Sequence, residues 1–235
     1  LQALVSPFVL RRVKEDVVAD LPEKIEDTVM AQLTGEQRKL YLANQDRIAQ
    51  QVQHREAGEF KKDKLKVLAE LTKLRQICCD PHLHYADYKA GSAKLDTCME
   101  LVHGALDGGH RILLFSQFTG MLDIIGKRLA KEDIAFLKFT GASSKESRAK
   151  MVAQFQAGEV PVFLISLKAG GVGLNLTAAD VVIHYDPWWN VAAQDQATDR
   201  AHRIGQQHTV TVYKLIAKDT IEERIMQMQE SKRDL

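Results

Sequence analysis

Five short apolar runs constrain the fold of this chain more than any other feature of its sequence. They cover residues 111–116, 134–139, 160–166, 180–185 and 209–216. Each run is nearly continuous in hydrophobic residues rather than alternating, which is typical of strands that are buried on both faces of a sheet. Because helical patterns separate the runs, we expect an α/β fold, in which a parallel sheet with right-handed crossovers is flanked by helices.

Helical periodicity fills the gaps between the apolar runs. Helices are expected at residues 94–106, 119–131, 145–157 and 190–202, and a last helix is expected from Thr220. In open parallel sheets, ligands bind at the loops that follow the carboxyl ends of the strands. We therefore expect the loops after the first four runs to carry the function.

The first ninety residues have a different character. Residues 1–33 are expected to be extended or irregular, because prolines interrupt them. A helix is expected from Thr34, which can form a capping box with Gln37. A second helix has apolar residues at three- and four-residue spacing over 65–77, and Pro81 ends it. The two helices are expected to form an antiparallel pair.

Composition narrows the class of protein. The chain has 235 residues and a formal net charge of +1, so a histone-like binder with a large positive excess is excluded. Three cysteines are too few for a disulfide framework and indicate a reducing compartment. No apolar run is long enough to span a bilayer. Because the sequence opens without Met, we expect it to be a piece of a longer protein.

Two motifs of nucleotide hydrolysis are missing. A phosphate loop reads G-x-x-x-x-G-K-[ST], and the nearest match, Gly104 to Gly109, fails because His110 follows it. Asp186 ends an apolar run, but Pro187 and two tryptophans come next, which favours a turn over a metal site. The predicted sheet therefore lacks its own machinery for holding a triphosphate, and no metal site is expected.

A glycine-rich loop follows the third apolar run. Gly170, Gly171 and Gly173 lie within four residues and permit backbone N–H groups to point into one concavity. Such a concavity can hold an anion such as a phosphate. An ordinary tight connection between strand and helix explains the loop equally well.

A second candidate site lies on the helix expected at 190–202. Continued in helical geometry, Gln196, Arg200 and Arg203 fall on one face, beside a stripe of alanines. Two neighbouring guanidiniums suit a multivalent anion, because each can bond two oxygens at once. The alternative is a solvated face with Asp195 and Asp199 as partners.

Two other groups have weaker signals. Trp188 and Trp189 follow a predicted strand, where aromatic rings can stack on bases or pack against the sheet edge. Residues 78–84 hold two cysteines and two histidines, but adjacent cysteines seldom bind one zinc ion. A zinc site is therefore not expected.

Taken together and in their order, these segments resemble the Swi/Snf-type ATPases, a branch of the superfamily-two helicase-like motors. The resemblance is to the second, C-terminal motor lobe and covers nearly the whole chain. The motifs that carry it lie at residues 7–12, 21–24, 74–78, 114–118, 166–176, 186–190, 196–206, 212–216 and 220–223.

The resemblance implies that the chain is divided into four parts. They are an inter-lobe connector at residues 1–33, a helical protrusion at 34–90, a RecA-like helicase C-terminal lobe at 91–218 and a brace helix at 219–235. The helical pair would thus be an N-terminal insertion on a RecA-like parallel sheet.

The resemblance also implies roles for individual residues. ATP and Mg²⁺ would be bound mainly by a first lobe, while Arg200 and Arg203 would reach across as arginine fingers and Gln196 would orient the site. The residues assigned to nucleotide binding are Gly171, Gly173 and Asn175. The residues assigned to DNA binding are Ser116, Gln117, Gly141, Lys168, Gly170, Trp189 and Asn190, and Gly171 borders the same surface.

By the same resemblance, the full-length protein would be a DNA-dependent ATPase that translocates along double-stranded DNA. Its partners would be the duplex, the N-terminal motor lobe of the same polypeptide and, as a further option, a DNA-bound protein complex, with no membrane involved. It would act in the cytoplasm, at the nucleoid, in a prokaryote and in the nucleus in a eukaryote.

Two other functions are open from the residues alone. A non-catalytic α/β module could present the helical pair to a protein partner. A small-molecule enzyme could use the glycine-rich loop, and it would then retain a nucleotide or sugar on purification.

The missing phosphate loop generates the first prediction. These 235 residues alone do not hydrolyse ATP, because nothing in the sequence cradles the triphosphate. A phosphate-release assay with and without duplex DNA checks this. Robust hydrolysis that disappears in Arg200→Ala would contradict the interpretation as half of a motor.

Overall fold

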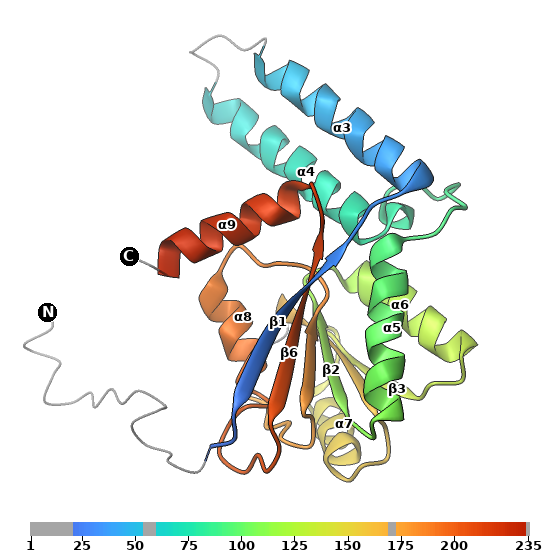
Figure 1. Cartoon of the computed structure of the whole chain (residues 1–235), viewed down its shortest axis with the longest axis vertical. Coiled ribbons are helices and arrows are strands. Elements are labelled where there is room, and N and C mark those ends of the chain that lie inside the picture. Colours follow the sequence, from blue (N-terminus) through green and yellow to red (C-terminus); the bar gives the residue numbers. More distant parts are fainter. Residues whose placement is uncertain (1–20, 54–59, 169–172, 234–235) are drawn as a thin grey trace, which may run out of the picture.

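The computed structural model describes residues 21–53, 60–168 and 173–233. A parallel sheet runs through its centre, with helices α5 and α6 packed on one face and α7 and α8 on the other (Figure 1). Helices α3 and α4 extend as a pair beyond the carboxyl ends of the strands, and α9 crosses the same end of the sheet (Figure 1). The α/β architecture with a helical pair attached is confirmed.

The sheet has six strands in the order β1-β6-β5-β2-β4-β3, and all of its pairings are parallel. The strands are β1 (Lys24–Ala31), β2 (Ile112–Ser116), β3 (Phe136–Phe139), β4 (Val162–Ser166), β5 (Val181–His184) and β6 (Val210–Ala217). The last five coincide with the five apolar runs, so the runs are confirmed as strands.

Alternate side chains of the central strands enter two separate cores. In β2, Ile112 and Leu114 pack with α5 and α6, whereas Leu113 and Phe115 pack with α7 and α8. All four side chains are fully buried. A strand that is covered on both faces is apolar at every position, which is why these strands read as continuous runs.

The helices lie close to the predicted segments, with one exception. They are α3 (Gly35–Gln53), α4 (Phe60–Cys79), the short 3₁₀ helix η1 (Pro81–Leu83), α5 (Ala93–Asp107), α6 (Thr119–Lys131), α7 (Lys145–Gln156), α8 (Val191–Thr198) and α9 (Ile221–Arg233). The exception is α8, which was expected to continue to residue 202 and ends at Thr198.

Strand β1 lies in a segment that was expected only to be extended or irregular. It pairs with β6 from Lys24 opposite Val210 to Ala31 opposite Ala217. Most of its side chains are exposed, because it forms the edge of the sheet. An edge strand needs no continuous apolar run, so the signal that identified the other five strands was absent here.

The helical pair is confirmed, but the predicted capping box at its start is wrong. Gln37 does not turn back to Thr34. Its buried side chain instead donates to the carbonyl of Ile77 at 3.0 Å and accepts from the N–H of Ala93 at 3.0 Å. Gln37 therefore joins the start of α3 to the end of α4 and the start of α5.

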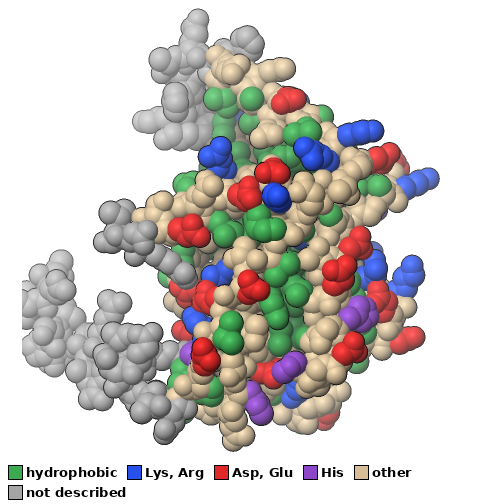
Figure 2. Space-filling view, viewed as in Figure 1, with side chains coloured by type: hydrophobic (Ala, Val, Ile, Leu, Met, Phe, Trp, Pro, Cys, Tyr) green, Lys and Arg blue, Asp and Glu red, His purple; other side chains and the backbone are tan. Residues whose placement is uncertain are grey.

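One face of the molecule shows no large excess of one charge. On the face seen in Figure 2, Lys and Arg side chains are interspersed with Asp and Glu. None of the helices in the described ranges has the length and apolarity that a membrane crossing needs.

A buried ion pair connects the helices at the carboxyl end of the sheet. Lys94 of α5 donates to both carboxylate oxygens of Glu222 in α9, and neither side chain is exposed. Glu222 also accepts from the N–H of Ala217, and Lys94 lies 5.4 Å from the centroid of the Tyr185 ring. Burial is the largest single influence on Lys94 and would lower its pKa, but the charge and hydrogen bonds of Glu222 together with Cys79 outweigh it, and the pKa of Lys94 is raised. Burial raises the pKa of the Glu222 carboxyl in turn, against the effect of the Lys94 charge.

Breaking this ion pair generates the second prediction. Lys94→Met should lower the free energy of unfolding by about 3–5 kcal/mol, because it leaves the Glu222 carboxylate buried without its cation. Urea unfolding followed by circular dichroism measures the change. The double variant Lys94→Met, Glu222→Leu should cost clearly less than Lys94→Met alone.

The matched control is Lys138→Met, since Lys138 pairs with Asp123 where both side chains are largely exposed. Its effect should stay within about 1 kcal/mol. Equal losses for Lys94→Met and Lys138→Met would contradict a special contribution from the buried pair.

Candidate nucleotide and nucleic-acid site

The candidate residues gather at one edge of the sheet. Strands β5, β2, β4 and β3 are neighbours, and because they are parallel, their carboxyl ends meet at the same edge. Ser116 is the last residue of β2, and the residues that follow the strand ends are Gln117 after β2, Gly141 after β3, Lys168 after β4, and Trp189 and Asn190 after β5. The sequence placed this edge correctly.

An open pocket lies between the end of β4 and helix α8. Its volume is about 230 Å³. The polar side chains that line it belong to Lys168, Gln196 and Arg200. The apolar lining consists of Phe115, Leu167, Ala193 and Ala197. The structure thus brings a predicted DNA contact beside two of the three predicted catalytic residues.

The geometry that was expected for the arginines is wrong. Since α8 ends at Thr198, Arg200 and Arg203 lie on the turns after it, and helical periodicity no longer relates them to Gln196. The chain leaves the helix because its backbone is held elsewhere. The carbonyl of Arg200 accepts from the N–H of Leu176 at 3.0 Å. A left-handed glycine, Gly205, closes the turn with φ +100°.

Gln206 anchors this arginine loop, which we define as residues 199–206. Its buried side-chain amide donates to the carbonyls of Thr177, Ala179 and Ala201, at 3.1, 2.7 and 3.1 Å. Sequence reasoning gave Gln206 no separate role, because its partners are distant in the chain and only the fold reveals them. The loop is therefore fixed to residues 176–179, directly before β5.

The two arginines occupy different environments. Arg200 lines the pocket and is 6% exposed, whereas Arg203 is exposed at the surface. Burial, and after it the positive charge of Arg203, lowers the pKa of Arg200. An anion close to both guanidiniums would oppose this shift, because an opposite charge favours the protonated form.

Ser116 and Gln117 make structural contacts that the sequence did not foresee. The Ser116 hydroxyl is fully buried and donates to Asp186, which is also buried. Gln117 donates from its side chain to the same carboxylate at 2.6 Å and to the carbonyl of Pro187 at 3.2 Å. Asp186 thus joins the loop after β2 to the loop after β5, in agreement with the expected turn. Their roles in DNA binding stay predictions.

The predicted glycine-rich loop is described only in part. Gly170 and Gly171 lie outside the described residues. Gly173 and Asn175 are exposed, as is Gly141 in the turn after β3. Each is accessible to a ligand at the carboxyl edge, and their assigned roles stay predictions.

Trp188 and Trp189 differ in exposure. Trp189 is 39% exposed, while Trp188 is half-buried and its N–H donates to Gln194 of α8 at 3.3 Å. Asn190 is exposed at the start of α8. Trp189 and Asn190 therefore remain available at the edge, while Trp188 belongs partly to the packing.

Residues 78–84 form the end of α4 and the short helix η1, and their side chains contribute to packing and capping. Burial is the main cause that raises the pKa values of Cys78 and Cys79, which disfavours the thiolate that zinc requires. Asp80 caps η1 and accepts from His82. Within residues 21–53, 60–168 and 173–233, no group of three or more His, Cys, Asp or Glu is arranged to hold a metal ion.

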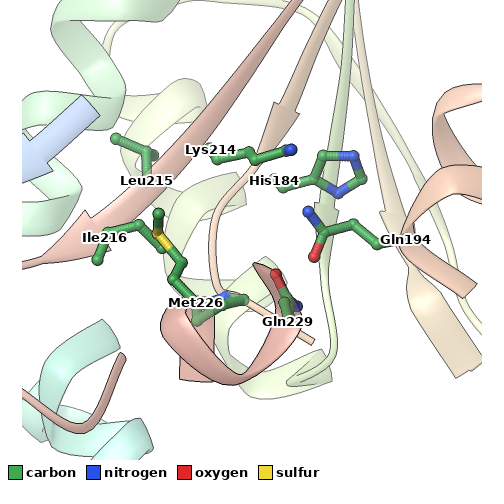
Figure 3. Close-up of a pocket in the computed structure, with 8 residues that line it drawn as sticks. His184, Gln194, Lys214, Leu215, Ile216, Met226 and Gln229 are labelled. Atoms are coloured by element: carbon green, nitrogen blue, oxygen red, sulfur yellow. The ribbon is translucent and has the colours of Figure 1, made fainter. Parts of the chain in front are cut away.

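A second cavity lies between β5, β6, α8 and α9 (Figure 3). Its lining includes His184, Gln194, Lys214 and Gln229, but it is too narrow to admit a water molecule. His184 stacks on Phe115, and its Nε2 lies 2.8 Å from the hydroxyl of Thr198. Because that hydroxyl donates to the carbonyl of Gln194, Nε2 is the donor. Burial lowers the pKa of His184 to about 3, so the ring is neutral near pH 7. This cavity is packing rather than a ligand site.

Fold and site together define a class of protein. A parallel sheet with a cationic pocket at its carboxyl edge, and with an arginine loop that supplies Arg200 to this pocket, is the arrangement of a RecA-like motor lobe. The family model for the helicase conserved C-terminal domain matches residues 93–205, and the model for the SNF2-related domain matches residues 1–83.

Known proteins agree with this class. The solved C-terminal domain of the Sulfolobus solfataricus SWI2/SNF2 ATPase is 34% identical, with a TM-score of 0.76 over 91% of this chain and 88% of that one. The SWI2/SNF2 ATPase core of the same organism, in complex with dsDNA, is 38% identical, with a TM-score of 0.78 over 99% of this chain and 50% of that one. This chain belongs to the SWI2/SNF2 family and corresponds to the C-terminal lobe of the family's ATPases.

The curated relatives are much longer than this chain. A Mycoplasma pneumoniae protein, described as an uncharacterized ATP-dependent helicase, is 42% identical over 98% of this chain, which spans 22% of that relative's length.

The buried His184 generates the third prediction. Burial, with the charge of Lys214 as the next cause, lowers the pKa of His184 to about 3, whereas an unfolded chain binds this proton near pH 6.5. Unfolding therefore takes up a proton below pH 6.5. As the pH is lowered from 6.5, the free energy of unfolding should decrease by up to about 1.4 kcal/mol per pH unit. Urea unfolding at pH 7, 6 and 5 measures this slope.

His184→Gln supplies the comparison, since it replaces the titrating ring with an uncharged amide that can still donate a hydrogen bond. Its stability should fall less steeply between pH 7 and pH 5 than that of the unmodified chain. Parallel pH profiles for the two proteins would contradict the assignment of the slope to His184.

Proposed function

We propose that this chain is the second motor lobe of an ATP-dependent double-stranded DNA translocase of the Swi/Snf type. Three findings support the proposal. The chain belongs to the SWI2/SNF2 family, a relative is described as an ATP-dependent helicase, and a structural neighbour was solved with dsDNA. The partner lobe would be the N-terminal motor lobe of the same polypeptide.

The observation that carries the proposal is the grouping of Lys168, Gln196 and Arg200 around one open pocket. Phosphate oxygens are the ligands that suit an ammonium, an amide and a guanidinium together. The lowered pKa of Arg200 supports the same chemistry, because a bound anion would stabilise its buried charge.

Arg200 and Arg203 would act as arginine fingers on the ATP bound by the first lobe. Arg203 is exposed on the arginine loop and can reach across an inter-lobe cleft, whereas Arg200 is held at the pocket wall. Stabilisation of the charge that develops in phosphoryl transfer would be their contribution. Gln196, which is exposed on α8 and lines the same pocket as Lys168 and Arg200, would orient the site.

The described residues fit ATP phosphates better than Mg²⁺. Cations and amides line the pocket, and within the described ranges no acidic cluster fits a metal ion. We therefore assign the Mg²⁺ ligands to the first lobe. The residues assigned to nucleotide binding, Gly171, Gly173 and Asn175, would add backbone and amide donors for the nucleotide.

The duplex would lie along the loops after β2, β3, β4 and β5. Gln117, Gly141, Lys168, Trp189 and Asn190 occur on these neighbouring loops, and Ser116 ends β2. Gly170, the remaining residue assigned to DNA binding, lies outside the described residues. Contacts of this kind are directed mainly at phosphates, which suits movement along DNA without base reading. A DNA-bound protein complex as the target, and the nucleoid or nucleus as the place of action, belong to the same proposal.

The four parts of the chain follow from this proposal. Residues 1–33 would connect the lobes and contribute β1, residues 34–90 would form the protrusion, residues 91–218 the motor lobe and residues 219–235 the brace. Opening and closing of the two lobes on ATP hydrolysis would step the protein along the duplex.

The arginine-finger role generates the fourth prediction. In the full-length protein, Arg203→Ala should lower kcat for DNA-stimulated hydrolysis by about 10³–10⁵-fold, because charge in the transition state loses its cation. Binding of a fluorescent ATP analogue should change little, since the first lobe would hold most of the nucleotide.

Arg38→Ala serves as the control, because Arg38 is an exposed arginine on α3, in the protrusion. It should leave hydrolysis unchanged. Normal turnover by Arg203→Ala would remove the arginine-finger role.

A further inference from the structure

Arg75, near the end of α4, is an unusual buried cation. It is 3% exposed, yet no carboxylate of the described residues forms an ion pair with it. Its Nε atom is buried and has no hydrogen-bond partner in the part of the chain that the structure describes. A buried guanidinium with this environment contributes less to stability than an apolar side chain of similar size would. Its presence is better explained by the geometry that it imposes.

That geometry joins the helical protrusion to two loops of the motor lobe. Arg75 donates from Nη2 to the carbonyl of Pro187 at 2.7 Å. Its guanidinium carbon lies 5.5 Å from the ring centroid of Phe118 and 5.4 Å from that of Trp189. Phe118 follows β2 and Trp189 follows β5, so one side chain of α4 contacts the loops of two neighbouring strands.

The other hydrogen bonds of the loop that Arg75 contacts lie at residues 186–188 and 190. Asp186 is bound by Ser116 and Gln117, and the carbonyl of Trp188 accepts from Gln229 of α9. None of these contacts involves the exposed indole of Trp189. Among the described residues, the cation–π contact recorded for this indole is the one with Arg75. The direction in which Trp189 projects from the edge therefore depends on Arg75.

We propose that Arg75 is a positioning residue for the DNA-binding edge, which sets the orientation of Trp189 against the duplex and couples it to the protrusion. The proposal rests on the proposed function above. A planar guanidinium is needed for this task, because it stacks on an aromatic face while it donates in its own plane. A lysine at this position keeps the charge but has no plane to stack, so it leaves Trp189 without a fixed direction.

The test measures DNA-stimulated ATP hydrolysis by the full-length protein at increasing concentrations of duplex. Arg75→Lys should raise the KM for DNA by about tenfold, the scale of one lost aromatic stack, while kcat at saturating DNA stays within about twofold. Trp189→Leu should raise the KM to the same extent. The double variant should be no worse than either single variant, because both remove the same contact.

The matched control is Lys73→Gln. Lys73 is on the same helix and lies 5.2 Å from the Tyr85 ring centroid, so it makes a cation–π contact within the protrusion. Its KM for DNA should be unchanged. A thermal melt of each variant separates positioning from folding, since Arg75→Lys should lower Tm no more than Trp189→Leu does.

The outcomes distinguish the two proposals. If the unmodified protein hydrolyses ATP without any stimulation by DNA, the proposed function is wrong, and the role of Arg75 is wrong with it. If DNA stimulates hydrolysis but Arg75→Lys changes Tm or kcat with an unaltered KM for DNA, Arg75 is only structural. Multiplicative effects of Arg75→Lys and Trp189→Leu on KM would also overturn the positioning role.

Discussion

A parallel strand that is covered on both faces can present polar side chains only at its ends. In β2, β4 and β5, every residue up to the last is buried. The carboxyl edge of the sheet is therefore where this protein can place chemistry, and the pocket at Lys168 and Arg200 lies there. The helical pair and the last helix pack at this end of the sheet (Figure 1), whereas the arginine loop is anchored to residues 177–179, directly before β5.

The polar contacts near this edge hold separate segments together. Gln37 joins α3 to α4 and α5, while the Lys94–Glu222 pair joins α5 to α9. Asp186 joins the loops after β2 and β5, and Arg75 adds the protrusion to them. Directional contacts of this kind specify how elements are arranged, whereas the two apolar cores mainly supply the driving force for folding.

Prediction from the sequence was most successful where the environment was simple. The apolar runs and the helical repeats report burial directly, so five strands and most helices were located within a few residues. Strand β1 was not predicted, because most of its side chains are exposed at the edge of the sheet and it has no continuous apolar run. The end of α8 was predicted wrongly because Gln206 and the N–H of Leu176 hold the residues after Thr198 in turns. Local periodicity does not report hydrogen bonds to partners that are distant in the sequence.

For the candidate site, too, some features could be predicted from the sequence and others depended on the tertiary structure. Order along the chain was enough to identify the residue types, the carboxyl edge and the resemblance to the motor family. The tertiary structure decided that Arg200 is buried and Arg203 exposed, that the Ser116 hydroxyl is used by Asp186, and that Arg75 contacts Trp189. The physical reason is distance in sequence. Burial and alternation are properties of neighbouring residues, whereas these contacts join residues that are 70 to 114 positions apart and form only when the sheet brings their loops together.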